Sequence, residues 1–236
     1  MMQQIPVVIP AAGVGQRMQA DRPKQYLQLH NKTLLEHTLH NLYNHPAIGA
    51  IYLVLSPEDE YFKTLKTLDL TRTHRVAGGA ERVDSVLAGL KAIAQTSSSN
   101  DWVLVHDAAR PCVSHADIDR LIDSQSHFED GAILASPVRD TMKRADIQSR
   151  EVIAETVPRN DLWHAYTPQM FRVNTLISAI EHGLSRNATL TDEASAMELF
   201  GKTVGLVHGS VSNLKVTTPD DLALAEFYLS RGETCA

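Results

Sequence analysis

Short apolar runs recur along the chain and are separated by longer stretches in which apolar residues repeat with a helical period. Five of these runs are rich in Val, Ile and Leu and almost continuously apolar: residues 5–9, 50–55, 102–106, 131–135 and 204–207. Strands that are buried on both faces have this composition, because neither face meets water. We therefore predict five strands of a buried sheet.

Helices are predicted between these runs from their starting signals and their periodicity. Thr33 and Glu36 form a capping box in front of an amphipathic stretch. Apolar residues repeat at helical spacing over 83–93 and after Ser114, and a Thr-Pro-Asp-Asp sequence from residue 218 starts a last helix. The alternation predicts an α/β fold with a doubly wound, mostly parallel sheet, whose ligands bind beyond the carboxyl ends of the strands.

Residues 137–159 interrupt this alternation. The segment contains two polar, strand-like stretches on either side of a turn, with little apolar surface of its own. A two-stranded hairpin is marginally stable by itself in water. We predict a single domain over 1–236 in which 137–159 forms a protruding β-hairpin arm that either lies on the domain or reaches a second subunit.

The composition limits the kinds of partner. The net charge is −6 and the basic residues fall singly, which argues against nucleic-acid binding and suits a small polyanionic ligand. Cys112 and Cys235 belong to no metal-binding array and are expected to be free thiols in a reducing compartment. Because no segment has the length of a membrane span and no leader precedes Ile5, we expect a cytoplasmic protein with no membrane partner.

A glycine-rich loop follows the first strand. Gly13 and Gly15 let the backbone approach a ligand closely, and successive N–H groups can hold phosphates. The loop lacks the third glycine of a dinucleotide fingerprint and the Gly-Lys-Ser/Thr of a P-loop. By itself it is equally consistent with an ordinary tight turn, but Arg17 and Lys24 nearby make it a candidate triphosphate site.

Asp107 follows the strand at 102–106, where a carboxylate is well placed to hold Mg²⁺ bound to phosphates. The alternative is a carboxylate that caps the next loop or pairs with Arg110. The neighbouring His106 is expected to be structural.

Two other segments have a structural explanation beside the functional one. The glycine turn at Gly79 leads into a helix in which Ser85 can face a base edge, but a capped helix start explains the same residues. Lys215 lies between apolar residues, and its spacing alone favours a solvated lysine on an edge strand.

Taken together and in this order, these segments resemble the 2-C-methyl-D-erythritol 4-phosphate cytidylyltransferases of the non-mevalonate isoprenoid pathway. The resemblance covers essentially the whole chain and rests on PAAGVGQRM from Pro10, PKQY from Pro23, DSV from Asp84, VHDAARP from Val105, RDTMK from Arg139 and LKVT from Leu214. It implies a Rossmann-like nucleotidyltransferase sheet. It also implies that the enzyme transfers CMP from CTP to the methylerythritol phosphate with Mg²⁺ and releases pyrophosphate.

The resemblance further implies roles for individual residues. Three basic residues would stabilise the transition state at the phosphates: Arg17, Lys24 and Lys215. Six residues would contact the nucleotide: Ala11, Ala12, Gly13, Gly15, Gly79 and Ser85. Six residues would contact the substrate: Asp107, Arg110, Thr141, Arg159, Thr167 and Thr191. Asp107 is also the residue expected to lie at the metal.

The resemblance gives the arm a function as well, in a homodimer whose arms carry Thr141 and Arg159 to the partner's substrate. The residues agree with this chemistry, because a phosphate nucleophile is ionised at neutral pH and the reaction needs positioning and positive charge rather than a strong base.

One alternative is a cytidylyltransferase for ribitol 5-phosphate or another polyol phosphate. Another is a non-catalytic nucleotide sensor on the same fold, and a nicotinamide-dependent dehydrogenase is remote.

Overall fold

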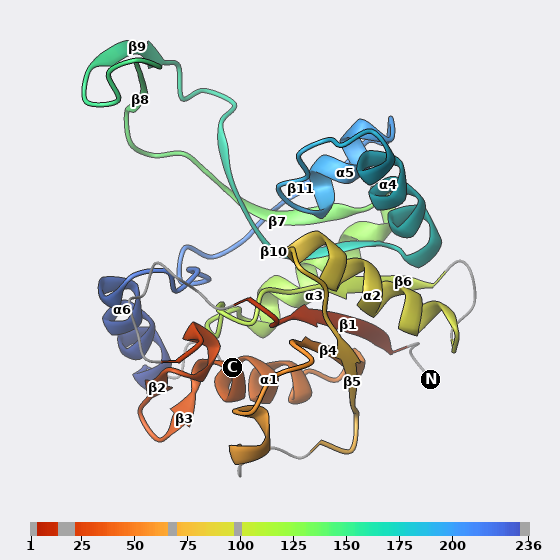
Figure 1. Ribbon diagram of the computed structural model, residues 1–236. Helices are drawn as coiled ribbons and strands as arrows, with labels where there is room; N and C mark the ends of the chain where they lie inside the picture. The colour runs from red at the N-terminus through yellow and green to blue at the C-terminus, as the bar shows by residue number, and fades with distance from the viewer. Residues whose placement is uncertain (1–3, 14–21, 66–69, 97–100, 232–236) are drawn as a thin grey trace.

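The computed structural model describes residues 4–13, 22–65, 70–96 and 101–231. Its centre is a seven-stranded sheet in the order β11-β7-β10-β6-β1-β4-β5 (Figure 1). The strands are β1 (Ile5–Pro10), β4 (Ile48–Leu55), β5 (Thr73–Ala77), β6 (Trp102–Val105), β7 (Ala132–Pro137), β10 (Trp163–Arg172) and β11 (Gly205–His208). All five predicted strands are present, and β5 and β10 are additional.

The sheet is parallel except at β10. This strand runs antiparallel to β6 on one side and to β7 on the other, so that Gln169 lies opposite both Val105 and Ile133. The remaining neighbours pair in parallel. The predicted mostly parallel sheet is therefore confirmed, with one reversed strand between β7 and β6.

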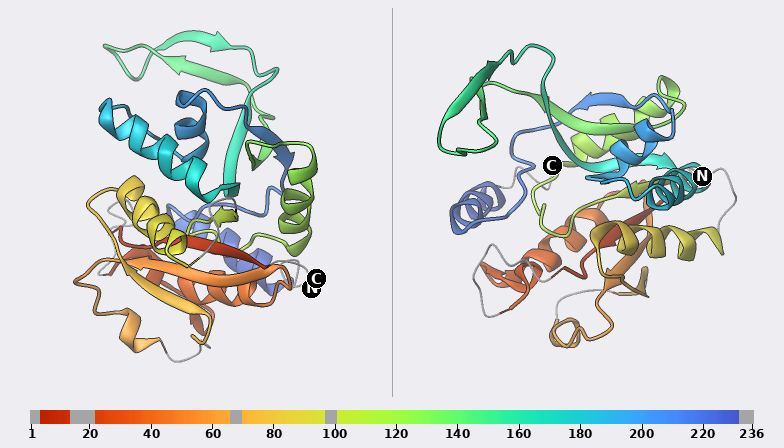
Figure 2. Two further views of the ribbon diagram at one scale, coloured as in Figure 1. Left: turned by 90° about the vertical axis from the view of Figure 1, so that its right-hand side faces the viewer. Right: turned by 45° about the horizontal axis from the view of Figure 1, so that its top comes forward.

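Helices cover both faces of the sheet (Figure 2). The helices α1 (Leu34–Tyr43) and α3 (His115–Asp123) pack on one face, and α2 (Arg82–Ala94), α4 (Val173–Ser185) and α5 (Glu193–Leu199) pack on the other. Because side chains alternate along a strand, Val7 and Ile9 of β1 enter the first core while Val8 enters the second. This arrangement confirms the doubly wound architecture.

The predicted helix starts are formed by the capping residues named from the sequence. Thr33 accepts from the Glu36 amide at 3.2 Å, while the Glu36 carboxylate accepts from the Thr33 amide at 2.7 Å. Ser114 caps α3, and Thr218 caps α6 (Pro219–Ser230). Short elements complete the fold: the hairpin β2 (Gln28–Leu29) and β3 (Lys32–Thr33), and 3-10 turns at Lys24–Tyr26, Phe62–Thr64 and Ser124–Ser126. Within the described ranges, no helix has both the length and the apolar composition needed to cross a membrane.

The arm projects from the body as an antiparallel pair, β8 (Met142–Ala145) and β9 (Ile153–Val157) (Figures 1 and 2). Pairing extends beyond the predicted segment, because the Val138 amide donates to the Leu162 carbonyl at 2.9 Å and so continues the β7–β10 pair. Ile147 at the tip is 94% exposed, and Val152 and Ile153 are also exposed. The predicted hairpin is confirmed, and its apolar side chains lack cover from the described part of the chain.

Candidate active site

A cavity of about 230 Å³ opens where the loops after β1, β5 and β6 converge. These are carboxyl ends of parallel strands, the edge at which ligands bind in doubly wound sheets. Eight of the predicted site residues line it: Ala11, Ala12, Gly13, Lys24, Gly79, Ser85, Asp107 and Lys215. Gly15 and Arg17, which were also predicted, lie outside the described residues.

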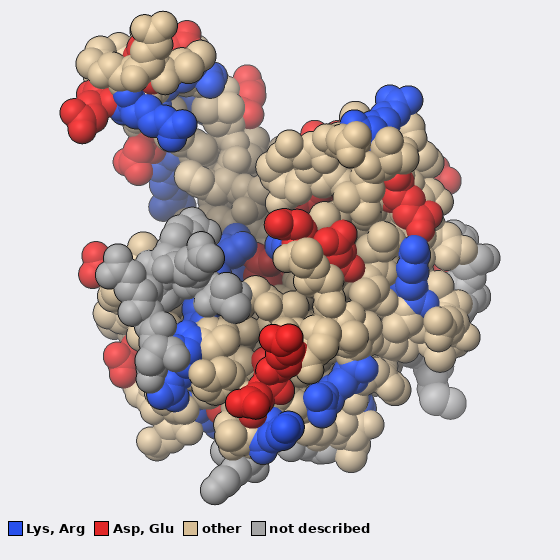
Figure 3. Space-filling model, in the orientation of Figure 1, with Lys and Arg blue, Asp and Glu red and all other residues tan. Residues whose placement is uncertain are grey.

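A second cavity of about 260 Å³ adjoins the first. It contains three more predicted residues, Arg110, Thr167 and Thr191, together with Gln169 of β10. Arg82, Asp107 and Lys215 line both cavities. In the space-filling view, basic and acidic side chains meet in a hollow near the centre of the face shown (Figure 3). The site is therefore a double cavity with a charged wall between its two halves.

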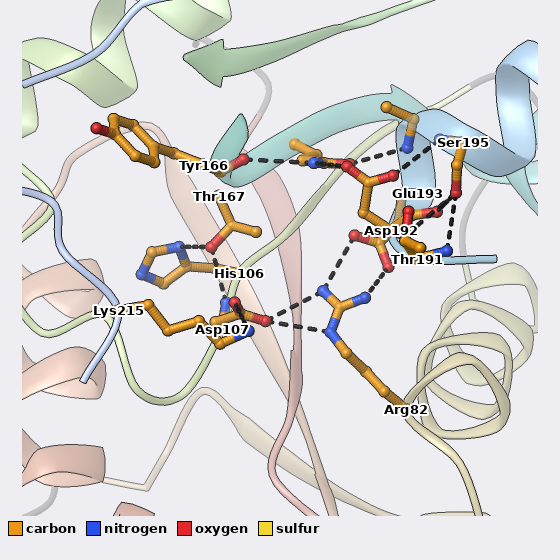
Figure 4. A network of polar contacts seen from close by, with 12 residues as sticks. Arg82, His106, Asp107, Tyr166, Thr167, Thr191, Asp192, Glu193, Ser195 and Lys215 are labelled. Carbon is orange, nitrogen blue, oxygen red and sulfur yellow. Dashed lines mark hydrogen bonds and ion pairs between the residues drawn. The ribbon is translucent and has the colours of Figure 1, made fainter. Parts of the chain in front are cut away.

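Asp107 is the centre of that wall. Its Oδ2 lies 2.8 Å from Lys215 Nζ, and its Oδ1 lies 3.1 Å from Arg82 Nη2 (Figure 4). Arg110 Nε lies 3.5 Å from Oδ2. Burial by itself would raise the pKa of the Asp107 carboxyl, but Arg82, Lys215 and Arg110 hold the pKa well below its ordinary range. An ionised carboxylate thus fixes three cations beside both cavities.

The backbone under Asp107 is held by His106 and Thr167. The His106 ring is fully buried and lies 3.0 Å from the Arg110 carbonyl through Nε2 and 3.0 Å from Thr167 Oγ1 through Nδ1. Thr167 Oγ1 also accepts from the Asp107 amide at 3.0 Å. Burial lowers the pKa of His106 to about 4. The ring is neutral near pH 7, which agrees with the structural role predicted for it.

The segments that carry Lys24 and Lys215 are joined to the same frame. Gln25 donates from Nε2 to the Ala11 carbonyl at 2.7 Å, which ties the Lys24 turn to the glycine-rich loop. The Val216 amide donates to the Ala109 carbonyl at 2.9 Å, and Lys24 Nζ lies 3.5 Å from the Val216 carbonyl. Two lysines separated widely in sequence therefore face the first cavity from a connected scaffold.

Close approach of the loops at Gly78 and Gly79 depends on the missing side chains. A Cβ on Gly78 would lie 2.7 Å from the Ala12 Cβ, and one on Gly79 would lie 2.3 Å from the Asp84 Cβ. The buried Ser85 hydroxyl accepts from the Gly79 amide at 3.3 Å and lines the first cavity. The glycine turn thus shapes one end of the cavity as well as starting α2.

The family is identified by comparison with known sequences. A sequence model of the family described as IspD, 2-C-methyl-D-erythritol 4-phosphate cytidylyltransferase, matches residues 5–231. The chain belongs to this family. The cytidylyltransferase class predicted from the sequence motifs is thereby confirmed.

Individual IspD relatives are similar over nearly their whole length. Two proteins named 2-C-methyl-D-erythritol 4-phosphate cytidylyltransferase, from Vibrio vulnificus and Photobacterium profundum, are 56% and 53% identical to this chain. The alignments cover 98% of this chain and 96% and 98% of the relatives. The crystal structure of the Francisella tularensis enzyme of that name superposes with a TM-score of 0.83 at 34% identity, over 96% of this chain and 100% of that one.

The two arm residues of the predicted IspD site stand apart from both cavities. Thr141 and Arg159 are exposed at the base of the arm, and Arg159 donates to the Arg139 carbonyl. Neither residue lines the double cavity of its own chain. Their predicted contact with substrate would therefore require the arm of another copy.

Sequence reasoning missed Arg82 and Glu193. Arg82 is the first residue of α2 and contacts Asp107, and Glu193 is the first residue of α5 and contacts Arg82. Arg82 follows Gly79 by three residues, so an arginine at a helix start beyond a strand end was an available signal. Glu193 had no comparable signal, because it lies 111 positions from its partner.

The carboxylates near the cavities could hold a metal ion only if a bound ligand supplied part of its coordination. Across the described ranges, no three His, Cys, Asp or Glu side chains are grouped as a metal site. Glu81 lines the first cavity and Asp192 lines the second, and Asp107 is the carboxylate that lines both. One carboxylate suits Mg²⁺ when phosphate oxygens and waters complete its coordination.

Proposed function

We propose that this chain transfers the cytidylyl group of CTP to 2-C-methyl-D-erythritol 4-phosphate and releases pyrophosphate. The observation that carries the proposal is the double cavity whose halves share Arg82, Asp107 and Lys215. A nucleotide in one half and a phosphorylated alcohol in the other would bring the acceptor phosphate and the α-phosphorus together at this charged wall. Holding two reactants in this way lowers the entropic part of the barrier.

The first cavity suits the nucleotide. Its glycine-rich loop offers backbone groups at Ala12 and Gly13, and Ser85 and the turn at Gly79 lie at another side of the same cavity. Backbone donors and acceptors can recognise both the carbonyl and the amino group of cytosine. Lys24 at the cavity wall is suited to the triphosphate, and we assign Gly15 and Arg17 to the same end on the strength of the sequence motif.

The second cavity suits the acceptor. Arg110 is buried with its guanidinium 5.1 Å above the Tyr166 ring, and Nη1 donates to the Asn213 carbonyl at 2.7 Å. A cation fixed in this way can orient a phosphate or hydroxyl group of the alcohol. Thr167 and Thr191 line the same cavity, and the Thr167 hydroxyl holds His106 and the Asp107 amide behind it.

Charge stabilisation accounts for the chemical step. An oxygen of the acceptor phosphate forms a bond to the α-phosphorus of CTP, and the bond from that phosphorus to the pyrophosphate oxygen breaks. The nucleophile is ionised at neutral pH, so no proton has to be removed from it. Lys24 and Lys215 are placed to stabilise the negative charge that is spread over the phosphoryl oxygens in the transition state.

We propose Mg²⁺ as the metal, held by Asp107 together with phosphate oxygens. Bound there, it would neutralise charge on the phosphates. The fit rests on the single carboxylate that faces both cavities.

We also propose a homodimer in which the arms are exchanged. Thr141 and Arg159 lie outside their own cavities, and the exposed Ile147, Val152 and Ile153 give the arm an apolar surface suited to a second copy. We further propose a cytoplasmic location.

The test is pyrophosphate release from the purified protein with Mg²⁺, CTP and methylerythritol phosphate. The parallel reactions replace CTP by ATP, GTP or UTP, and replace the alcohol by ribitol 5-phosphate. Chelation of the metal is the control for metal dependence. Release with CTP and methylerythritol phosphate alone supports the proposal, and release with ribitol phosphate instead would overturn the assigned alcohol. No release with any pair would favour a nucleotide sensor.

A further inference from the structure

Arg82 joins Asp107 to a second carboxylate that neither the mechanism nor the sequence motifs use. Its Nη1 lies 2.6 Å from Glu193 Oε1 and its Nη2 lies 3.1 Å from Glu193 Oε2. The other side of the same guanidinium reaches Asp107 Oδ1, at 3.2 Å from Nε and 3.1 Å from Nη2. Figure 4 shows Arg82 between the two carboxylates. Both contacts match the planar fork of arginine, which a lysine could not reproduce.

Glu193 is buried at the start of a well-capped helix. Its side chain is 3% exposed, and it is the first residue of α5. The cap of this helix is fixed by Asp192, which accepts from the Ser195 amide at 2.9 Å, and by Gln169, which donates to Asp192 at 2.9 Å and accepts from the Ala194 amide at 3.0 Å. These contacts fix the backbone from which the buried Glu193 side chain extends to Arg82.

The two oxygens of Asp107 are divided between its cations. Oδ1 binds Arg82, while Oδ2 binds Lys215 at 2.8 Å. If Arg82 were free to shift, both oxygens would be open to it and the position of the Lys215 ammonium would no longer be set. The bidentate contact with Glu193 prevents that shift.

Glu193 also sets the charge at the junction of the cavities. Arg82, Arg110 and Lys215 carry three positive charges, and Asp107 and Glu193 carry two negative charges. Removing the Glu193 charge would change the sum for these five groups from +1 to +2. An anionic nucleotide would then bind no less well, even though the catalytic groups were less well placed.

We propose that Glu193 is a positioning residue for the transfer reaction: by clamping Arg82 it orients the Asp107 carboxylate and, through it, the Lys215 ammonium. This proposal rests on the function proposed above. It separates Glu193 from residues that bind substrate, because the side chain reaches the reactants only through Arg82 and Asp107.

The first test is Glu193→Gln, which keeps the shape of the side chain and removes its charge and one acceptor. We expect kcat to fall about 10-fold, as for other groups that orient a site from behind it, while the KM for CTP stays unchanged or falls. The control is Glu181→Gln, which removes the carboxylate of an exposed pair, Lys91–Glu181, that joins α2 to α4 at 2.7 Å. The control should keep wild-type kinetics, and circular dichroism should show that both variants are folded.

The second test is a double-mutant cycle with Arg82→Gln. If Glu193 acts only through Arg82, adding Glu193→Gln to Arg82→Gln causes no further loss of kcat. Losses that multiply would overturn the proposal, as would wild-type kcat in Glu193→Gln or a rise of the KM for CTP in parallel with the fall of kcat. A wild-type protein that is inactive with CTP and methylerythritol phosphate would instead refute the proposed function. If it used ribitol phosphate, the same cycle would be measured with that alcohol.

Discussion

Acid should destabilise the folded protein through His106. The Arg110 carbonyl can only accept, so we assign the proton of the neutral ring to Nε2, which leaves Nδ1 to accept from the Thr167 hydroxyl. Thr167 in turn accepts from the Asp107 amide. A second proton on the ring would face a hydroxyl group that already donates toward Nδ1, in a fully buried position near Arg110.

The magnitude follows from the pKa of His106, which burial lowers from 6.5 to about 4. Between pH 6.5 and about pH 4, His106 binds a proton in the unfolded chain but not in the folded protein. The free energy of unfolding therefore falls as the pH falls. Each pKa unit corresponds to about 1.4 kcal/mol, which gives a full effect of about 3 kcal/mol. Between about pH 7 and about pH 5, His106 alone is expected to lower the free energy of unfolding by about 2 kcal/mol.

The assay is urea unfolding at these two pH values for the wild type and for His106→Gln, at one protein concentration. The Gln amide can still donate toward the Arg110 carbonyl but does not titrate. The variant should be less stable than the wild type near pH 7, because the Thr167 contact is lost. Its further loss on acidification should be smaller than that of the wild type by about 2 kcal/mol. Equal losses in the two proteins would refute the argument.

Three other substitutions test the site, the arm and the core. Lys215→Ala should lower kcat about 100-fold, equivalent to about 3 kcal/mol, in the pyrophosphate assay, and near-wild-type turnover would contradict its catalytic role. Arg159→Ala should raise the KM for methylerythritol phosphate more than that for CTP. Mixing Arg159→Ala chains with Lys215→Ala chains should then restore one site in each mixed dimer, and a mixture without restored activity would contradict arm exchange. Gly89→Ala would place a Cβ 2.6 Å from Val8 Cγ1 and should lower the free energy of unfolding by about 1–3 kcal/mol, whereas an unchanged urea midpoint would argue against tight α2–β1 packing.

The central strands could be predicted from the sequence because their environment is uniform. The strands β1, β4, β6 and β7 are buried on both faces. Burial on both faces requires apolar residues at nearly every position, and this pattern is visible in the sequence. The edge strand β5 reads Thr-His-Arg-Val-Ala with none of its residues buried, so it gave no comparable signal. In β10 the first half is largely exposed and only the second half enters the core. Its reversed direction depends on tertiary pairing that local sequence does not encode.

The lining of the cavities was predictable where family motifs mark it, and less so where contacts join distant parts of the chain. The first cavity is lined largely by loops that directly follow strands, and the motifs around Gly13 and Asp107 lie in those loops. Glu193, which binds Arg82, lies on a helix far along the chain, and no sequence spacing predicts that contact. The sequence also suggested that Asp107 pairs with Arg110. That contact is present, but it is longer than the contacts of Asp107 with Arg82 and Lys215.

The reversed strand β10 has a consequence for how this protein could be rebuilt. The arm leaves the sheet after Pro137 and returns at Trp163, and these two residues lie opposite each other in the β7–β10 ladder. The arm therefore occupies the position of the loop in an ordinary β-hairpin formed by β7 and β10. A short turn of a few residues could connect the two strands in its place. The length of the arm could therefore be changed without altering the pairing of β7 with β10.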